Sequence, residues 1–201
     1  MFKKLKKELQ INIEEKEGQL YLGPKAKNIH LLMLRPIDII EFSEFAGSDA
    51  EDVLVWVGKS LGQDLLQRFF YFKDWAPVDL STKKEVIIGC LQAIELLGFG
   101  VLKAIFKKSH VLINVHDSFA LDEKENIMAK NLCLLYQGIL TSIFETLLIE
   151  TDAEEIECCL LNSDKCVFKF ELLNVEFEDK DIDGGQADDI VKPIRFYGEK
   201  F

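Results

Sequence analysis

The sequence of 201 residues lacks the short motifs of the common nucleotide-binding and hydrolytic enzymes. No P-loop, G-x-G-x-x-G or G-x-S-x-G pattern occurs, which argues against a nucleotide-cofactor enzyme and against an α/β-hydrolase. Only three histidines are present, and His30 and His110 flank expected strands without metal-ligand spacing. His116 and Asp117 are adjacent, so in a strand they point to opposite faces and form no simple catalytic pair. The sequence therefore offers no catalytic residue.

Positive charge and long apolar runs are also scarce. The chain has 24 Lys and Arg against 35 Asp and Glu, a formal net charge of −11. A protein that grips phosphates needs a basic face, so a nucleic-acid partner is not expected. No run approaches the ~20 apolar residues of a membrane span. The first ten residues, MFKKLKKELQ, are charged and contain no apolar signal-peptide core. We therefore expect a cytoplasmic protein without a membrane span.

Length and composition favour one globular domain with appendages, because 48% of the residues are apolar and can supply a sizeable core. We expect an N-terminal hairpin and extension over residues 1–35. A ligand-binding domain should follow over residues 36–175. The acidic, glycine-containing stretch 176–201 has the composition of a flexible tail.

Hydrophobic periodicity predicts both strands and helices. The expected strands are residues 9–15, 19–23, 101–106, 111–119, 154–161 and 166–173, and the expected helices are 36–45, 53–70, 83–97 and 127–148. Pro36 and Gly47 suit the start and the end of the first helix. Ser48 and Thr82, each followed three residues later by Glu, predict capping boxes for the next two helices. The fold class is α+β, with an antiparallel sheet of about four strands packed against several helices.

Cysteine is where the sequence carries chemistry. The segment EIECCLLNSDKC places Glu155, Cys158 and Cys166 in an E-x-x-C-x₇-C pattern, and Cys133 precedes it by 22 residues. Three thiols and a carboxylate are a plausible tetrahedral zinc set. The remaining cysteine outside this segment, Cys90, lies in an apolar helix and is expected to be a small core residue.

Spacing alone leaves a second interpretation open, in which these cysteines are buried core residues without a metal. No C-x-x-C pair favours the metal further. Regular strand alternation puts Glu155 and Cys158 on opposite faces and Glu155 and Cys159 on the same face. Both interpretations therefore remain at this point, and a zinc site that includes Cys158 requires a bulge or an irregular strand.

Residues 87–172 resemble the 4-vinyl reductase domain family. The resemblance rests on LLGFG at 96–100, NVHDSFA at 114–120, Cys133 followed by Gly138 in a helix, and Glu155-x-x-Cys158-x₇-Cys166. Gly58 and Gly62 look like the small positions of the family's earlier helix. This resemblance implies a small-molecule-binding fold that is shared with the TRAPP vesicle-tethering subunits and with the sensory domains of phenol-responsive activators.

The resemblance also implies a set of ligands and an assembly. In the phenol-sensing members a structural zinc is held by Cys, Glu, Cys and Cys in this order, which corresponds here to Cys133, Glu155, Cys158 and Cys166. Cys159 is then a neighbour, and a bulge is expected near Glu155. Asn162 stands where the family usually has glycine in the hairpin turn, and asparagine tolerates the left-handed conformation nearly as well. The family further implies a homodimer with a helical interface.

Aromatic residues suggest where a ligand binds. The segment RFFYFKDW holds five aromatic residues, and apolar ligand sites are rich in such side chains. We expect a hydrophobic pocket that includes Trp56, Phe69, Phe72 and His116, with Trp56 in a dimer interface as the alternative. The leading hypothesis is a zinc-containing domain that senses or carries a small hydrophobic molecule and acts through a protein partner. The alternatives are a tetrapyrrole vinyl reductase and a TRAPP-like scaffold subunit.

Overall fold

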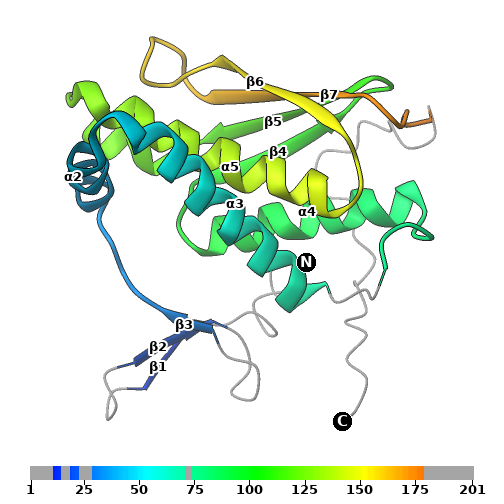
Figure 1. Cartoon of the computed structure of the whole chain (residues 1–201), viewed down its shortest axis with the longest axis horizontal. Helices are drawn as coiled ribbons and strands as arrows, with labels where there is room; N and C mark the ends of the chain where they lie inside the picture. Colours follow the sequence, from blue (N-terminus) through cyan, green and yellow to red (C-terminus); the bar gives the residue numbers. More distant parts are fainter. Residues whose placement is uncertain (1–10, 15–18, 23–28, 71–73, 179–201) are drawn as a thin grey trace.

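A four-stranded antiparallel sheet forms one layer of the fold in the computed structural model, which describes residues 11–14, 19–22, 29–70 and 74–178 (Figure 1). Its strands are β4 (Val101–Phe106), β5 (His110–His116), β6 (Thr151–Glu157) and β7 (Cys166–Leu172), in the spatial order β4-β5-β7-β6. Two hairpins, β4-β5 and β6-β7, meet where β5 pairs with β7. The sheet and the helices below confirm the predicted α+β class.

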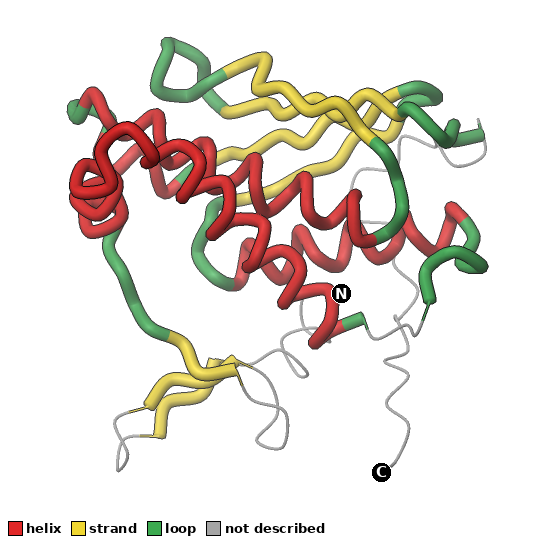
Figure 2. The backbone as a smooth tube through the Cα atoms, viewed as in Figure 1, coloured by secondary structure: helices red, strands yellow, loops and turns green. Residues whose placement is uncertain are grey.

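Helices make up the second layer and cover one face of this sheet (Figure 2). They are α2 (Pro36–Ala46), α3 (Ala50–Phe69), α4 (Leu80–Leu96) and α5 (Asn131–Thr146). The inner residues of α4 and α5, among them Ile87, Ile94 and Ile139, are buried with Ile113 and Phe168 of the sheet in one apolar cluster. Burial of this kind supplies most of the stability of such a layered fold.

The helices α3 and α5 pack unusually close because both present glycines at their contact. A Cβ added to Gly58 would lie 2.4 Å from the carbonyl oxygen of Leu135, and one added to Gly62 would lie 2.4 Å from that of Ile139. A Cβ on Gly138 would lie 2.3 Å from the carbonyl oxygen of Val55. These distances are shorter than any real Cβ contact, so the backbones can approach only where no side chain intervenes.

Two helix starts differ from their prediction. The first helix begins at Pro36 and stops at Gly47, which has φ 64°, as predicted. Ser48, however, makes no cap for α3 and contacts Asp49 instead. Asp79 rather than Thr82 caps α4, since its Oδ1 accepts a hydrogen bond of 2.9 Å from the Thr82 N–H. The capping-box pattern therefore lay three residues inside the true start of α4.

The segment before α5 is a 3₁₀ helix, whereas the sequence predicted one continuous α-helix from this point. Asn126 accepts a hydrogen bond from the Met128 N–H and so starts the 3₁₀ helix Ile127–Lys130, which leads into α5. Contrary to the expectation that no segment reaches membrane-spanning length, Ile127–Thr146 is long and apolar enough by length and composition. In the window that meets this criterion, 67% of the residues are buried inside the protein, as a central core helix requires.

A second sheet of three short strands lies on the other side of the helices, away from the main sheet (Figure 1). It consists of β1 (Ile11–Glu14), β2 (Gln19–Leu22) and β3 (Ile29–Leu31), and β1 pairs with β2 as the predicted hairpin. The segment that follows, residues 32–34, joins it to α2 and exposes all three of its apolar side chains.

A core residue lies close to the end of the described chain. Phe177, which lies in the predicted tail, has 0% exposure and packs edge-on against Phe106 with ring centroids 4.9 Å apart. Its N–H also donates to the carbonyl of Lys108, 3.1 Å away. Residues 176–178 thus cover the β4-β5 hairpin, while the rest of the predicted tail lies outside the described residues.

Candidate metal centre

Three elements converge on the predicted metal ligands. Cys133 is the third residue of α5, Glu155 lies in β6, Cys158 follows the end of β6 and Cys166 opens β7. Since β6 and β7 are paired neighbours, their connected ends bring Cys158 and Cys166 to one place. The first turn of α5 packs against that end of the hairpin, which adds Cys133. Cys133 therefore meets residues that lie 22 to 33 positions later in the chain at a single point.

The geometry of these four residues suits one small cation. The three Sγ atoms and a carboxylate oxygen of Glu155 all lie within 4.8 Å of one another. Cys133 Sγ and Cys158 Sγ are 3.7 Å apart. A tetrahedral zinc with sulfur ligands at about 2.3 Å separates those sulfurs by about 3.8 Å. The distances require little movement to close a metal site.

A bulge in β6 makes this arrangement possible. Glu155 pairs with Phe168 and Glu157 pairs with Val167, so β6 contains one more residue than β7 between these two pairs. The extra residue, Ile156, is exposed. The bulge reverses the alternation for the rest of the strand, which lets Glu155 and Cys158 reach the same side. The irregularity predicted near Glu155 is confirmed.

The donor set itself indicates a missing positive charge. Glu155 Oε1 is buried and has no hydrogen-bond partner, which is costly for a carboxylate. Cys166 is completely buried and Cys133 nearly so. Among the described residues no Lys, Arg or His forms an ion pair with Glu155. A divalent cation supplies both the missing charge and the missing partner, so the residues present fit zinc.

The thiols influence one another strongly. The hydrogen bond from Cys133 is the main reason that the pKa of Cys166 lies below its usual value, and the same bond, with burial, raises the pKa of Cys133. Burial raises the pKa of Cys158 to about 11. Among these thiols Cys166 is the one whose pKa is lowered. Bound zinc deprotonates its thiols outright.

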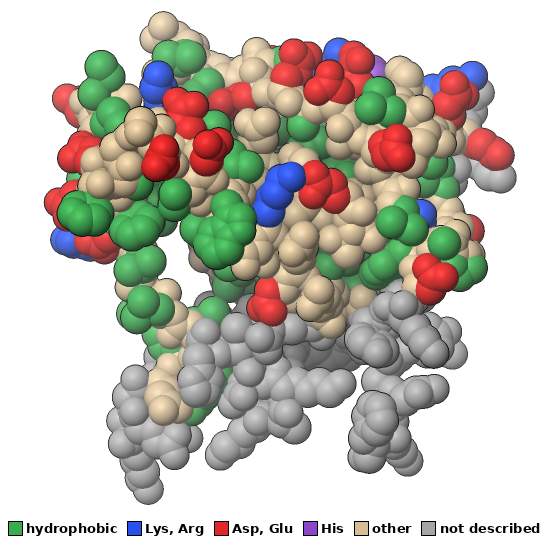
Figure 3. Space-filling view, in the orientation of Figure 1, with side chains coloured by type: hydrophobic (Ala, Val, Ile, Leu, Met, Phe, Trp, Pro, Cys, Tyr) green, Lys and Arg blue, Asp and Glu red, His purple; other side chains and the backbone are tan. Residues whose placement is uncertain are grey.

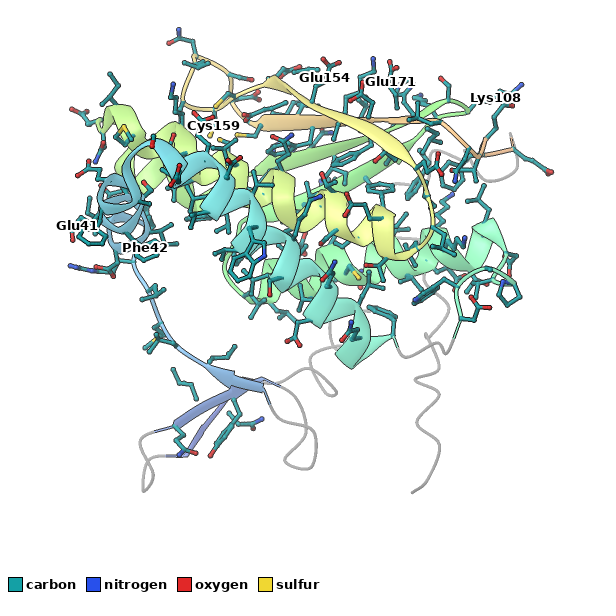
Figure 4. The ribbon with its side chains drawn as sticks, in the orientation of Figure 1. Glu41, Phe42, Lys108, Glu154, Cys159 and Glu171 are labelled. Carbon is teal, nitrogen blue, oxygen red and sulfur yellow. The ribbon has the colours of Figure 1, made fainter. Side chains whose placement is uncertain are left out.

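Cys159 lies beside this set without joining it. Figure 4 shows Cys159 among the sulfur atoms gathered near the start of α5 and the end of the hairpin. Its Sγ is 3.3 Å from Cys166 Sγ, and its N–H donates to the same sulfur over 3.4 Å. Such an N–H bond stabilises a thiolate and orients it. Cys159 is thus placed as the predicted neighbour of the ligands.

The turn that joins the two strands holds the site's shape. The carbonyl of Cys158 accepts hydrogen bonds from the N–H groups of Leu161 and Ser163, at 2.9 and 3.4 Å. Asn162 has φ 72°, in the left-handed region where the sequence pattern placed it. Asparagine adopts this conformation more readily than most residues, so the turn forms without glycine.

Of the four predicted pocket residues, the structure describes the side chains of Trp56 and His116. Trp56 is 70% exposed on α3, and His116 is half-buried at the end of β5. Phe72 lies outside the described residues, and the side chain of Phe69 is not described. Trp56 therefore lies on the surface of the protein, and a pocket formed by these four residues stays a prediction.

An interior aromatic cluster was missed by the sequence reasoning. Four aromatic rings pack together, and the centroids of contacting rings are 5.1–6.0 Å apart; they are Phe99, Phe119, Tyr136 and Phe168. The Tyr136 hydroxyl donates to the carbonyl of Phe99 and is 3.2 Å from Ser118 Oγ. The ring of Tyr136 points from α5 toward the sheet, one turn beyond Cys133. Its position at i+3 from a predicted ligand was the available signal.

The fold and the four donors together define an α+β domain with a candidate metal centre between a helix and a hairpin. No protein-family model matches the sequence, and no curated protein matches it. Among solved structures, the phenol-responsive sensory domain of the transcription activator PoxR, crystallised with phenol, has a TM-score of 0.60 at 15% identity. That match covers 85% of this chain and 88% of the sensory domain, so the two share a fold.

Weaker likenesses reach two other classes of protein. An H-NOX protein from S. oneidensis in the Fe(II)NO state has a TM-score of 0.47 at 14% identity, covering 76% of this chain and 84% of that one. Subunit 3 of a trafficking protein particle complex from Naegleria fowleri, covalently bound to palmitic acid, has a TM-score of 0.40 at 15% identity. It covers 71% of this chain and 99% of that one. Only the first likeness supports the fold assignment.

Proposed function

We propose that this protein is a regulatory domain that binds a small hydrophobic molecule. The observation that carries the proposal is the fold shared over 85% of the chain with a sensory domain crystallised with phenol. The absence of an acid–base pair among the residues singled out from the sequence favours binding over catalysis. The signal would pass to a protein partner through a change in the domain's surface, and we place the protein in the cytoplasm.

In this proposal a zinc ion has a structural role. Cys133, Glu155, Cys158 and Cys166 would hold it, and four protein ligands leave no open position for water or substrate. When bound, zinc supplies a cross-link and a positive charge. The chain's own contribution is to fix the first turn of α5 to the β6-β7 hairpin. Metal binding then adds to folding stability rather than to reactivity.

The layer between α5 and the sheet is our proposed ligand position. It combines the apolar rings of Phe99, Phe119 and Phe168 with two hydroxyls, those of Tyr136 and Ser118. A few polar groups among aromatic walls are typical of sites for small apolar ligands that carry one polar atom. Because Tyr136 and Cys133 lie one turn apart on α5, a ligand here would press on the helix that the metal holds.

Native mass spectrometry and thermal unfolding of the full chain test this binding role. A phenol or a short fatty acid present at 100 times its Kd stabilises the protein by about 2.7 kcal/mol. For a chain of this size the midpoint then rises by roughly 5–10 °C. Tyr136→Phe should weaken a phenol, whereas Trp56→Ala should not. The proposal is wrong if no apolar compound copurifies and no compound of either class shifts the midpoint.

We also propose that the exposed apolar face of α2 and α3 joins two copies of the chain. Phe45 is 91% exposed and Phe42 and Trp56 are largely exposed, although all three are large apolar residues. Figure 3 shows hydrophobic side chains over α2 and the adjoining part of α3, with acidic side chains beside them. Patches of this kind mark interfaces, and Glu41, labelled in Figure 4 next to Phe42, belongs to the acidic surroundings.

Sedimentation velocity can test the dimer. Two copies that each carry a formal charge of −11 repel, so salt should strengthen the association by screening that repulsion. Phe45→Glu and Trp56→Glu should each give monomers. Leu173→Glu is the matched control, because Leu173 is also exposed but lies just after β7, away from α2 and α3. A wild-type monomer at all salt concentrations would rule out this interface.

A further inference from the structure

The fourth thiol near the metal centre, that of Cys159, has no role in the structural site described above. Cys159 Sγ lies 3.3 Å from Cys166 Sγ, and the side chain is half-buried, so small solutes have partial access to it. In a disulfide the two sulfurs are about 2.05 Å apart. The pair must therefore approach by little more than 1 Å. For comparison, Cys133 Sγ and Cys158 Sγ are 3.7 Å apart.

The backbone around Cys159 permits this approach. β6 ends at Glu157, so Cys159 belongs to the connecting turn and not to the paired ladder. A shift of its side chain breaks no strand hydrogen bond. Cys166, in contrast, is fixed as the first residue of β7. Cys159, whose side chain can shift, is thus outside the donor set. Cys166, which β7 holds in place, is one of the four donors.

We propose that Cys159 and Cys166 form an oxidisable dithiol, with a peroxide as the oxidant, which withdraws Cys166 from the metal centre. The Cys159 thiol attacks one peroxide oxygen, the O–O bond breaks, and the products are a Cys159 sulfenic acid and one water. The Cys166 sulfur then attacks the Cys159 sulfur, the S–O bond breaks, and a second water leaves. In zinc-free protein two thiols and one hydrogen peroxide thus give one disulfide and two waters, with both thiol protons in the waters. In zinc-loaded protein Cys166 is a thiolate, so solvent supplies the proton of the second water.

The consequence follows from the donor count. Once Cys166 is in a disulfide, only Cys133, Glu155 and Cys158 remain for the metal. Three donors bind zinc more weakly than four and no longer include a residue of β7. The contact between α5 and β7 loses its cross-link, whereas Cys133 and Cys158 still connect α5 to the end of β6. Oxidation therefore loosens one strand of the hairpin while the sheet stays paired.

The reaction should be slow. The Cys159 side chain is half-buried, so peroxide reaches its sulfur only slowly. We therefore expect it at millimolar peroxide over minutes to hours. Tris(2-carboxyethyl)phosphine should reverse it, since a disulfide is the end product and not a sulfinic acid.

Peptide mass mapping of the full chain after hydrogen peroxide treatment is the decisive test. The expected product links the peptide of Cys159 to that of Cys166, and it should form in zinc-loaded and in zinc-free protein. The zinc readout rests on the proposed metal site, but the disulfide readout does not, so the two ideas can fail separately. A disulfide between Cys158 and Cys159 or between Cys133 and Cys158 as the first product would overturn the proposal.

Zinc release, followed with a chromophoric chelator, gives the second readout. Cys159→Ser should slow peroxide-driven release at least about fivefold, because the attacking thiol is gone. Cys90→Ala is the matched control, since Cys90 is buried in α4 and leaves all four sulfurs of the site in place. Equal release rates for the Cys159→Ser variant and wild type would contradict the proposal, whatever the absolute rate.

Discussion

Gly58 of α3 touches Gly138 of α5: a Cβ placed on Gly58 would lie 3.0 Å from the Cα of Gly138. The same Cβ would lie 2.4 Å from the carbonyl oxygen of Leu135, which belongs to the backbone and cannot turn away. The two helices therefore touch backbone to backbone. Because Cys133 lies in the first turn of α5, this contact also fixes the helix that carries the first candidate metal ligand.

Gly58→Ala should consequently destabilise the protein although alanine has the higher helix propensity. Overpacking of this kind costs about 1–3 kcal/mol, which corresponds to a fall of roughly 2–12 °C in Tm for a chain of this size. Thermal unfolding measures it. Ser60→Ala, at an exposed position two residues on, is the control and should change stability by no more than about 0.5 kcal/mol. Equal Tm values for the two variants would show that α3 and α5 can separate freely.

The unpartnered carboxylate gives a second prediction. Glu155→Gln keeps the shape of the side chain but removes its charge, so zinc affinity should fall at least about 10-fold in a competition titration. Glu154→Gln is the matched control, because Glu154 lies next in the strand and faces Lys169 at 3.7 Å on the surface. An unchanged affinity for Glu155→Gln would remove Glu155 from the ligand set.

The cap of α4 makes stability depend on pH in a defined direction. Hydrogen bonds from Thr82 hold the pKa of Asp79 below its usual value. A carboxylate with a lowered folded-state pKa contributes fully above its unfolded pKa of about 3.9 and loses that contribution as pH falls through the folded value. Asp79→Ala should cost about 1 kcal/mol at pH 7 and less near pH 3. Asp79→Asn should retain most of the cap, so urea unfolding of both variants at the two pH values separates cap from charge.

Phe177 supplies a prediction about the end of the domain. Removing a buried phenylalanine ring typically costs about 3–5 kcal/mol, so Phe177→Ala should lower Tm by more than about 6 °C. Leu173→Ala serves as the control because its side chain is 65% exposed. If Phe177→Ala were as stable as its control, the domain would end where the sequence suggested, at Val175.

The sequence predicted the parts of the fold that depend on periodicity and on one specific spacing. Alternation located both hairpins of the main sheet, and the conflict between alternation and the E-x-x-C spacing predicted the bulge near Glu155. It missed the cap at Asp79, because the Thr82 pattern is also a valid cap and only the path of the preceding chain selects between them. Tertiary contacts decide such cases.

The proposed ligand site was harder to predict for a related reason. Trp56 and its aromatic neighbours have the composition of a pocket, but composition does not say which face of a helix is covered. Gly58 and Gly62 lie on the side of α3 that contacts α5. Trp56 lies on another side of the same helix and is exposed. The cluster around Tyr136 joins residues from four separate segments, and no local pattern connects them.

X-ray absorption at the zinc edge of the full-length protein tests the metal centre most directly. We expect one zinc per chain, with three sulfur ligands at about 2.3 Å and one oxygen ligand at about 2.0 Å. Cys158→Ser and Cys166→Ser should lose both the metal and stability, whereas Cys159→Ser should keep the wild-type spectrum. Protein without stoichiometric zinc, or a spectrum with four sulfurs that loses one in Cys159→Ser, would contradict this ligand set.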